Sequence, residues 1–296
     1  MPLSVARMSA AGGAEVGGVD PRSPLTAGVA AALDAALTEY GVLLFRERPL
    51  TARQLTAFAR VFGPIQPHVQ RKYQHPEVPD VVIMTNRNPD GSFDEAGARR
   101  GAIENPRDGW HSDLSYDPVP AKATLLHAID IPSTGGNTCF TNVTLAYHAL
   151  APDLKLRLNG LMAEFRYGGH QRNPSARVAA QALDAKARQQ ASARHPVVNA
   201  HRVTGRPGIY ANPLLASAIV GMAQEEAEAL LEPLFDAIDR PEFRWEHEWR
   251  LGDTLVWDNR GGVMHSGRLD YPLHEARRFI RTTVRGATLI PFTYRP

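Results

Sequence analysis

The sequence predicts a fold that is mostly β with added helices, in which sheets of short strands form a jelly roll. Two observations predict it: short strand-like segments follow one another closely in the last third of the chain, and helical patterns occur early. We therefore expect an α+β protein built on a double-stranded β-helix (a cupin-like jelly roll) with helical additions and long lid loops. The sequence shows no internal repeat or long linker, so we expect one domain over 1–296.

The N-terminal region carries two helix signals around one strand signal. Thr26 can cap a helix whose apolar residues recur at helical spacing until Gly41 ends it. A fully apolar strand is expected next, over 42–45. Thr51 can cap a second helix, which the Gly-Pro pair at 63–64 ends.

Two loop-rich stretches, at about 66–108 and about 166–176, interrupt the regular patterns. Both are rich in Arg, Asn, Pro and Gly, and only 81–84 in the first is strand-like. A loop-rich stretch as long as the first is usually functional in a compact domain, so we predict that both are lids over a site. Residues 175–193, which are rich in Ala and Gln, are predicted to form an exposed helix.

The remaining elements follow from apolar or alternating segments bounded by turn residues. We expect helices over 145–150 and 224–238, with Pro233 kinking or dividing the second. The expected strands are 123–129, 138–141, 161–167, 196–200, 208–211, 243–249, 255–258, 263–265 and 277–286.

Composition excludes several classes of protein. Of the 296 residues 43% are hydrophobic and 22% charged, with a formal net charge of +2, so nothing points to nucleic acid or an anionic membrane. Cys139 is the single cysteine, which excludes an intramolecular disulfide and a cysteine-based zinc cluster. No apolar run approaches the length of a membrane span, and the N-terminus lacks a signal-peptide pattern. We expect a soluble, cytoplasmic protein.

The run 109–113 carries the first chemical signal. His111 and Asp113 lie two residues apart, and in an extended segment this spacing places both side chains on one face. With a second histidine they would form a 2-His-1-carboxylate facial triad, which suits Fe(II) and leaves three coordination positions open. His265, in a short segment late in the chain, is the strongest candidate. The alternative for any single histidine is a surface residue or a hydrogen-bonded core residue.

A pair of arginines near the C-terminus is the second signal. On a strand, Arg277 and Arg281 share one face, and Arg278 lies on the other. A buried guanidinium generally needs an anionic partner and can bind a carboxylate through two parallel hydrogen bonds. The alternative is an exposed strand whose arginines pair with Glu275 or Asp270.

Taken together, these motifs resemble a known family, the Fe(II)/2-oxoglutarate dioxygenases of the taurine and 2,4-dichlorophenoxyacetate dioxygenase group. The resemblance covers nearly the whole chain, from about residue 17 to 286. The motifs that carry it, in order, are 110–113, 132–138, 256–260, His265, 270–271 and 277–283.

The resemblance implies roles for individual residues. His111, Asp113 and His265 would bind Fe(II). Thr138 would donate a hydrogen bond to the distal carboxylate of 2-oxoglutarate, and Arg277 would form an ion pair with the same carboxylate. Aligning the sequence on its double arginine instead assigns that ion pair to Arg278; we prefer Arg277 because it shares a strand face with Arg281.

The resemblance also implies substrate contacts. Arg281 would bind an anionic head group of the substrate, and His68 matches a lid histidine that contacts substrate. We add Tyr73 and Asn86 as expected substrate-binding residues.

The expected activity is therefore that of an Fe(II)- and O2-dependent dioxygenase that decarboxylates 2-oxoglutarate to succinate and CO2. It would hydroxylate, or thereby cleave or desaturate, a small anionic substrate such as a sulfonate, a sulfate ester or a carboxylate. The alternatives are a zinc-dependent hydrolase with the same His-Asp-His site and a non-catalytic jelly-roll protein that binds a small molecule. We expect a homo-oligomer, either a dimer or a tetramer, with no nucleic-acid or membrane partner.

Overall fold

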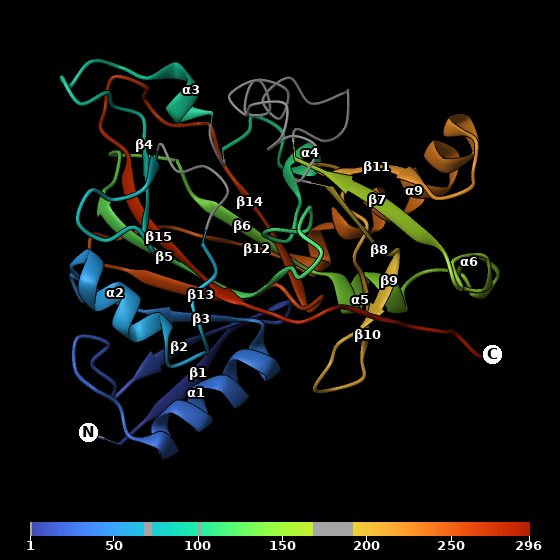
Figure 1. The fold of residues 1–296 in the computed structure, drawn as a ribbon, viewed down its shortest axis with the longest axis horizontal. Helices are drawn as coiled ribbons and strands as arrows, with labels where there is room; N and C mark the ends of the chain where they lie inside the picture. The colour runs from blue at the N-terminus through green and yellow to red at the C-terminus, as the bar shows by residue number, and fades with distance from the viewer. Residues whose placement is uncertain (1, 68–72, 100–101, 168–191) are drawn as a thin grey trace.

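The computed structural model describes residues 2–67, 73–99, 102–167 and 192–296. Its architecture is mixed α and β, with strands predominating (Figure 1). Within the described residues, the largest sheet has seven strands in the order β1-β2-β3-β13-β5-β15-β4. Three smaller sheets have the orders β12-β6-β14, β11-β7-β8 and β10-β9-β16.

The bounds of these elements are as follows. The strands of the large sheet are β1 (Ser4–Ser9), β2 (Gly12–Gly17), β3 (Val42–Phe45), β13 (Thr254–Asp258), β5 (Ala121–Asp130), β15 (Arg278–Arg285) and β4 (Val82–Thr85). The other strands are β6 (Thr138–Asn142), β7 (Met162–Arg166), β8 (Ser192–Pro196), β9 (Val198–Ala200), β10 (Pro207–Ile209), β11 (Ala216–Ile219), β12 (Arg244–His247), β14 (Val263–Gly267) and β16 (Ile290–Pro291). The helices are α1 (Ala27–Tyr40), α2 (Ala52–Ala59), α3 (Glu95–Ala98), α4 (Pro106–Gly109), α5 (Val143–His148), α6 (Pro152–Arg157), α9 (Gln224–Ile238) and the 3-10 turn η2 (Pro241–Phe243).

The two predicted N-terminal helices are confirmed with their caps. The Thr26 hydroxyl accepts a hydrogen bond from the backbone N–H of Val29, and Gly41 ends α1 with a φ of 74°, which glycine adopts without strain. Thr51 and Gln54 form a reciprocal capping box at the start of α2. Both helices pack their apolar faces on one side of the seven-stranded sheet (Figure 1).

The opposite side of the seven-stranded sheet packs against the β12-β6-β14 sheet, and this pairing forms the jelly-roll core. Leu126 of β5 and Phe279 of β15 meet Phe140 of β6 and Val263 of β14 in one buried cluster. Trp257 of β13 lies in the same cluster with 1% of its surface exposed. The predicted jelly roll with helical additions is therefore confirmed, and its two sheets enclose the region where the candidate site lies.

A further hydrophobic cluster joins the centre of the chain to α9. Leu230, Leu231 and Leu234 of α9 pack with residues of α5, β7 and β11. Pro233 lies inside α9 without dividing it. Of the two expected effects, division is therefore not found, whereas a kink at Pro233 stays a prediction. Burial of the apolar face stabilises the helix although Pro233 removes one backbone hydrogen bond.

Other expectations on local structure need correction. The segment 110–113 is not a strand: α4 ends at Gly109, His111 makes a single backbone bridge, and a turn begins at Asp113. The strand expected over 243–249 is shorter, because η2 replaces its start and β12 ends at His247. The first expected lid contains β4, α3 and α4, so it is more regular than predicted.

Some expectations fall outside the described residues. These are the parts of the first lid at 68–72 and 100–101, including His68, and the part of the second lid at 168–176. Residues 175–191 of the expected exposed helix also lie outside, whereas 192 and 193 begin β8. None of the helices in the described part of the chain is long and apolar enough to cross a membrane.

Candidate active site

The three predicted metal ligands come together between the two main sheets. One possible ligand atom from each of His111, Asp113 and His265 lies within 4.8 Å of the other two. His111 Nε2 is 3.8 Å from Asp113 Oδ1, and His265 Nε2 is 3.9 Å from Asp113 Oδ2. The two imidazole ring centroids are 4.1 Å apart.

Backbone hydrogen bonds fix the two histidines to each other. The N–H of His111 donates to the carbonyl of His265 at 3.1 Å, and the N–H of His265 donates to the carbonyl of His111 at 3.0 Å. Because β14 carries His265, this bridge docks the segment after α4 onto the jelly roll. The Nδ1 of His111 lies 2.7 Å from the carbonyl of Gly109, so Nδ1 carries the proton and Nε2 keeps its lone pair free.

The carboxylate of Asp113 is held by groups from three strands. Its Oδ2 accepts hydrogen bonds from the Thr124 hydroxyl of β5 at 2.6 Å and the Trp257 indole N–H of β13 at 3.1 Å. Its Oδ1 accepts from Arg281 Nη2 of β15 at 2.7 Å. The side chain of Asn259 accepts from the backbone N–H of Asp113 and donates to Thr124, so it ties the two together.

Electrostatics place the three groups in the protonation states that a metal ion requires. Burial lowers the pKa of His265 to about 3, with the neighbouring His111 adding to the effect. Burial also lowers the pKa of His111. Burial by itself would raise the pKa of Asp113, but the Arg281 guanidinium and both imidazoles outweigh it, and the pKa is lowered. Two neutral imidazoles therefore face one ionised carboxylate at neutral pH.

This donor set fits Fe(II). Two imidazole nitrogens and one carboxylate oxygen form the facial triad typical of non-haem Fe(II) sites, which leaves coordination positions open for other ligands. Hydrogen bonds to the outer atoms of ligands orient them toward a metal, and both His111 and Asp113 have such bonds.

A pocket of about 450 Å³, including its opening to solvent, extends from the histidines toward the start of β15. Arg277 lies in its wall with 8% of its surface exposed. The guanidinium donates to the carbonyl of Gly136 through Nε at 3.2 Å and Nη2 at 3.0 Å, and it stacks over the ring of Phe279 at 4.4 Å. Burial lowers the pKa of Arg277 to about 10. No carboxylate among the described residues forms an ion pair with it.

Thr138 lines the same pocket from the first position of β6. Its hydroxyl oxygen accepts a hydrogen bond from the indole N–H of Trp249 at 3.1 Å. Because this bond occupies a lone pair, the hydroxyl proton remains available to donate. Thr138 and Arg277 thus present two hydrogen-bond donors to one end of the pocket.

The structure separates the two candidate arginines. Arg278 lies on the other face of β15, where its side chain is 51% exposed and pairs with Asp130 at 2.9 Å. Arg281 lies beside the triad, with its side chain 13% exposed. Its Nη2 bonds to Asp113, whereas its buried Nε has no hydrogen-bond partner among the described residues.

The remaining predicted residues lie as follows. Asn86 is buried, and its amide bonds to the backbone around Arg277: Oδ1 accepts from the N–H of Arg277 and Nδ2 donates to the carbonyl of Glu275. Its expected contact with substrate stays a prediction. Tyr73 is half-buried and is not among the residues that line the pocket. His68 lies outside the described residues.

Comparison with known proteins agrees with this geometry. The model of the family described as "Taurine catabolism dioxygenase TauD, TfdA family" matches residues 4–283. The chain belongs to this family. Its fold is the double-stranded β-helix of the family, and it is an enzyme of the Fe(II)- and 2-oxoglutarate-dependent dioxygenase class. The predicted family, enzyme class and cofactors are confirmed.

Individual relatives match over most of their length. The alpha-ketoglutarate-dependent 2,4-dichlorophenoxyacetate dioxygenase of Cupriavidus pinatubonensis is 31% identical over 275 residues, which cover 90% of this chain and 91% of that protein. An alkylsulfatase of Acinetobacter baylyi is 28% identical over 276 residues, which cover 91% of this chain and 81% of that protein. The solved structure of AAD-2 in complex with Mn(II) and N-oxalylglycine has a TM-score of 0.82 and 28% identity, covering 97% of this chain and 99% of that chain.

Sequence reasoning missed the residues of this dioxygenase that hold the expected ligands in place. Thr124, Trp257 and Asn259 fix Asp113, and Trp249 orients Thr138. Trp257 and Asn259 lie in the 256–260 motif, which offered a signal for them. Thr124 and Trp249 carry no local signal, because their partners lie far away in the sequence.

Proposed function

We propose that this dioxygenase hydroxylates, or thereby cleaves or desaturates, a small anionic organic substrate such as a sulfonate, a sulfate ester or a carboxylate. His111, Asp113 and His265 bind Fe(II), and Thr138 and Arg277 bind the distal carboxylate of 2-oxoglutarate. Arg281 binds the anionic group of the substrate. Bound Fe(II), 2-oxoglutarate and O2 supply the oxidation of a substrate C–H bond, with succinate and CO2 as the other products.

The observation that carries the cosubstrate assignment is the unneutralised guanidinium of Arg277. A buried charge is costly unless an opposite charge and hydrogen bonds compensate it. The carbonyl of Gly136 supplies hydrogen bonds but no charge. A carboxylate that enters from the histidine side would form an ion pair with Arg277 and accept a hydrogen bond from the Thr138 hydroxyl, which matches the distal end of a diacid.

The protein's own groups perform the positioning. Thr124 and Trp257 hold Asp113 through Oδ2, so the orientation of the carboxylate is fixed before a metal ion binds. Phe279, Leu126 and Met84 line the pocket and limit the access of water. Arg277, which immediately precedes β15, and Arg281 of β15 are four positions apart and line the same pocket, so two separate anions can be bound there.

Arg281 supports the choice of an anionic substrate. Its Nη2 neutralises Asp113, but its Nε–H is buried without a partner among the described residues. An unpaired buried donor costs free energy, and an anionic head group would satisfy it. The names of the two curated relatives point to a carboxylate in one and a sulfate ester in the other, which agrees with an arginine that accepts either head group.

A substrate screen tests the proposal. The protein is incubated with Fe(II), O2, 2-oxoglutarate and panels of carboxylates, sulfonates and sulfate esters, each beside its uncharged amide or alcohol counterpart, and succinate is measured. We expect anions to stimulate succinate formation more than their neutral counterparts, and Arg281→Gln to remove this preference.

Two results would contradict the proposal. Equal stimulation of succinate formation by the neutral and anionic members of each pair would exclude a preference for an anionic substrate. Hydrolysis supported by Zn²⁺ without consumption of 2-oxoglutarate would instead favour a hydrolase at the same three residues.

A further inference from the structure

A second pocket lies at the other end of β15, away from the histidines. It encloses about 770 Å³, including its opening to solvent, and shares no lining residue with the first pocket. The start of β5, the end of β9, the residues after β15 and Asp34 of α1 form its wall. Arg281 of the first pocket and Arg285 of the second are four positions apart on β15, so roughly 13 Å of strand lies between these two lining residues.

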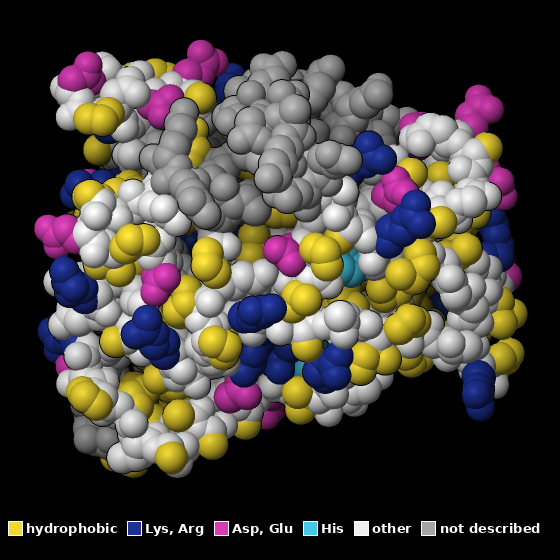
Figure 2. All heavy atoms as spheres, in the orientation of Figure 1, with side chains coloured by type: hydrophobic (Ala, Val, Ile, Leu, Met, Phe, Trp, Pro, Cys, Tyr) yellow, Lys and Arg dark blue, Asp and Glu magenta, His cyan; other side chains and the backbone are white. Residues whose placement is uncertain are grey.

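Four cationic side chains line this second pocket, and only one carboxylate does. The cations are Lys122, Arg202, Arg260 and Arg285, and the carboxylate is Asp34. Figure 2 shows Lys and Arg side chains gathered low on the visible face, over the region between α1 and β10. Whether positive charge is left to bind a ligand depends on which of the four cations already form ion pairs with carboxylates of the protein.

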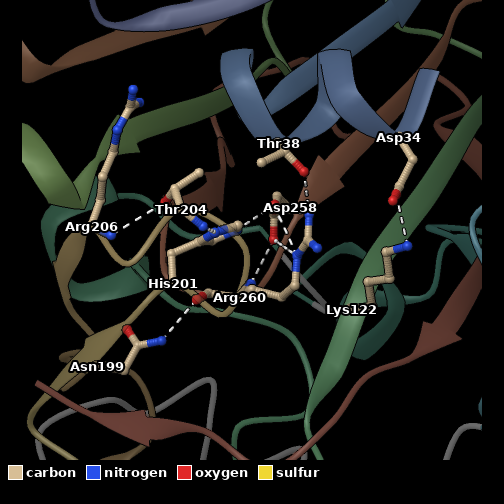
Figure 3. Close-up of polar contacts among 9 residues, drawn as sticks. All are labelled: Asp34, Thr38, Lys122, Asn199, His201, Thr204, Arg206, Asp258 and Arg260. Carbon is tan, nitrogen blue, oxygen red and sulfur yellow. Dashed lines mark hydrogen bonds and ion pairs between the residues drawn. The ribbon is translucent and has the colours of Figure 1, made fainter. Parts of the chain in front are cut away.

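The two inner cations are already neutralised. Lys122 donates to the carbonyl of Phe62 at 2.8 Å and pairs with Asp34 at 2.7 Å. Figure 3 shows the second pair, in which Arg260 binds both oxygens of the buried Asp258. These pairs form a fixed wall with no net charge.

The two outer cations are not neutralised. Arg202 donates to the carbonyl of Thr288, which places its guanidinium against the segment after β15 without giving it a counter-charge. Arg285 is exposed at the last position of β15. Neither arginine forms an ion pair with any carboxylate of the described residues, so the pocket carries a net charge of about +2 at its mouth.

The rim of the pocket is apolar. Val203 is 63% exposed and Ile290 is 38% exposed, and both line the same opening as the two unpaired arginines. Large apolar side chains at the edge of a cationic pocket favour a ligand with an apolar body over a small hydrated ion.

We propose that this second pocket binds a small organic anion that has an apolar body, such as a phosphate ester or an aryl carboxylate. Arg202 and Arg285 bind the anionic group, and Val203 and Ile290 contact the body. The site is independent of the iron centre, so the proposal stands or falls separately from the proposed substrate.

Calorimetric titration with phenyl phosphate at low ionic strength tests the proposal. Wild type, Arg202→Gln/Arg285→Gln, Arg278→Gln and Arg281→Gln are compared. We expect the double variant to weaken binding at the second pocket by about tenfold or more, because each arginine supplies a charge-assisted hydrogen bond. Arg278→Gln is the matched control, since it removes an exposed arginine of the same strand that already has a partner.

Arg281→Gln separates the two pockets. Binding that persists in this variant and disappears in the double variant assigns the anion to the second pocket. Wild type, the double variant and Arg278→Gln should unfold at similar temperatures, because Arg202, Arg285 and Arg278 are exposed. The double variant should also keep the wild-type rate of succinate formation. The proposal is overturned if wild type does not bind phenyl phosphate, if the double variant binds as tightly as wild type, or if Arg278→Gln weakens binding equally.

Discussion

Arg277→Ala should weaken the binding of 2-oxoglutarate far more than Arg278→Ala. The two residues are neighbours in the sequence, but Arg277 is buried in the pocket wall, whereas the Arg278 side chain is half exposed and pairs with Asp130. Truncating one partner of a buried, hydrogen-bonded charge pair costs about 2–5 kcal/mol. At about 1.4 kcal/mol for each factor of ten, the dissociation constant should rise from about thirtyfold to a few thousandfold.

An exposed ion pair contributes at most about 1 kcal/mol to stability and nothing directly to the pocket, so Arg278→Ala should change the dissociation constant by less than about threefold. The assay is anaerobic titration of the Fe(II)-loaded protein with 2-oxoglutarate, which measures affinity without turnover. Arg277→Lys is the internal check: it keeps the charge but loses the two-pronged geometry, and should fall between wild type and Arg277→Ala. The reasoning is refuted if Arg278→Ala has the larger effect, or if Arg277→Ala folds normally and binds 2-oxoglutarate as wild type does.

Three further predictions follow from individual contacts. Asp113→Ala should abolish Fe(II) binding in equilibrium dialysis, because two imidazoles remain without the anionic ligand; retained stoichiometric binding would contradict the assigned ligand set. Trp249→Phe should raise the dissociation constant for 2-oxoglutarate by about three- to tenfold, because Thr138 loses the hydrogen bond that orients its hydroxyl, and Trp245→Phe is the control. Burial lowers the pKa of His127 to about 4. Between about pH 6.5 and about pH 4 the unfolded chain therefore binds a proton at this residue that the folded protein does not. The free energy of unfolding should fall by about 3 kcal/mol for this residue as the pH drops through that range. His127→Gln should flatten that part of the pH profile in denaturant titrations, and an unchanged slope would count against the assignment.

Many strands and helices followed from local patterns of apolar residues and from the capping and turn residues beside them. Thr26, Gly41 and Thr51 mark the ends of α1 and α2 because capping depends on a few adjacent residues. The placement of Arg277 and Arg278 on opposite sides of β15 follows from strand alternation in the same way. The sequence around Pro233 left open whether the proline kinks or divides its helix, because the tertiary packing that keeps α9 undivided has no local signature.

The candidate site was located by motif, but its geometry did not follow from the assumed strand. His111 and Asp113 were expected to share a strand face, whereas the chain turns at Asp113 and Leu114 adopts a φ of 57°. Thr124 donates to the carboxylate of Asp113 and Asn259 accepts from its backbone N–H, and both residues lie outside the local sequence of Asp113. Contacts of this kind depend on which strands become neighbours, and sequence spacing does not reveal that.

The reciprocal backbone bridge between His111 and His265 has a consequence for biosynthesis. Among the described residues, the segment around His111 has no other strand partner at this point, so it can take up this position only after β14 has been made and has paired with β6. Pairings between distant parts of a chain form late in folding. With the proposed ligand set, a ribosome-bound chain that still lacks β14 has only two of the three iron ligands, so we expect metal loading to follow the synthesis of β14.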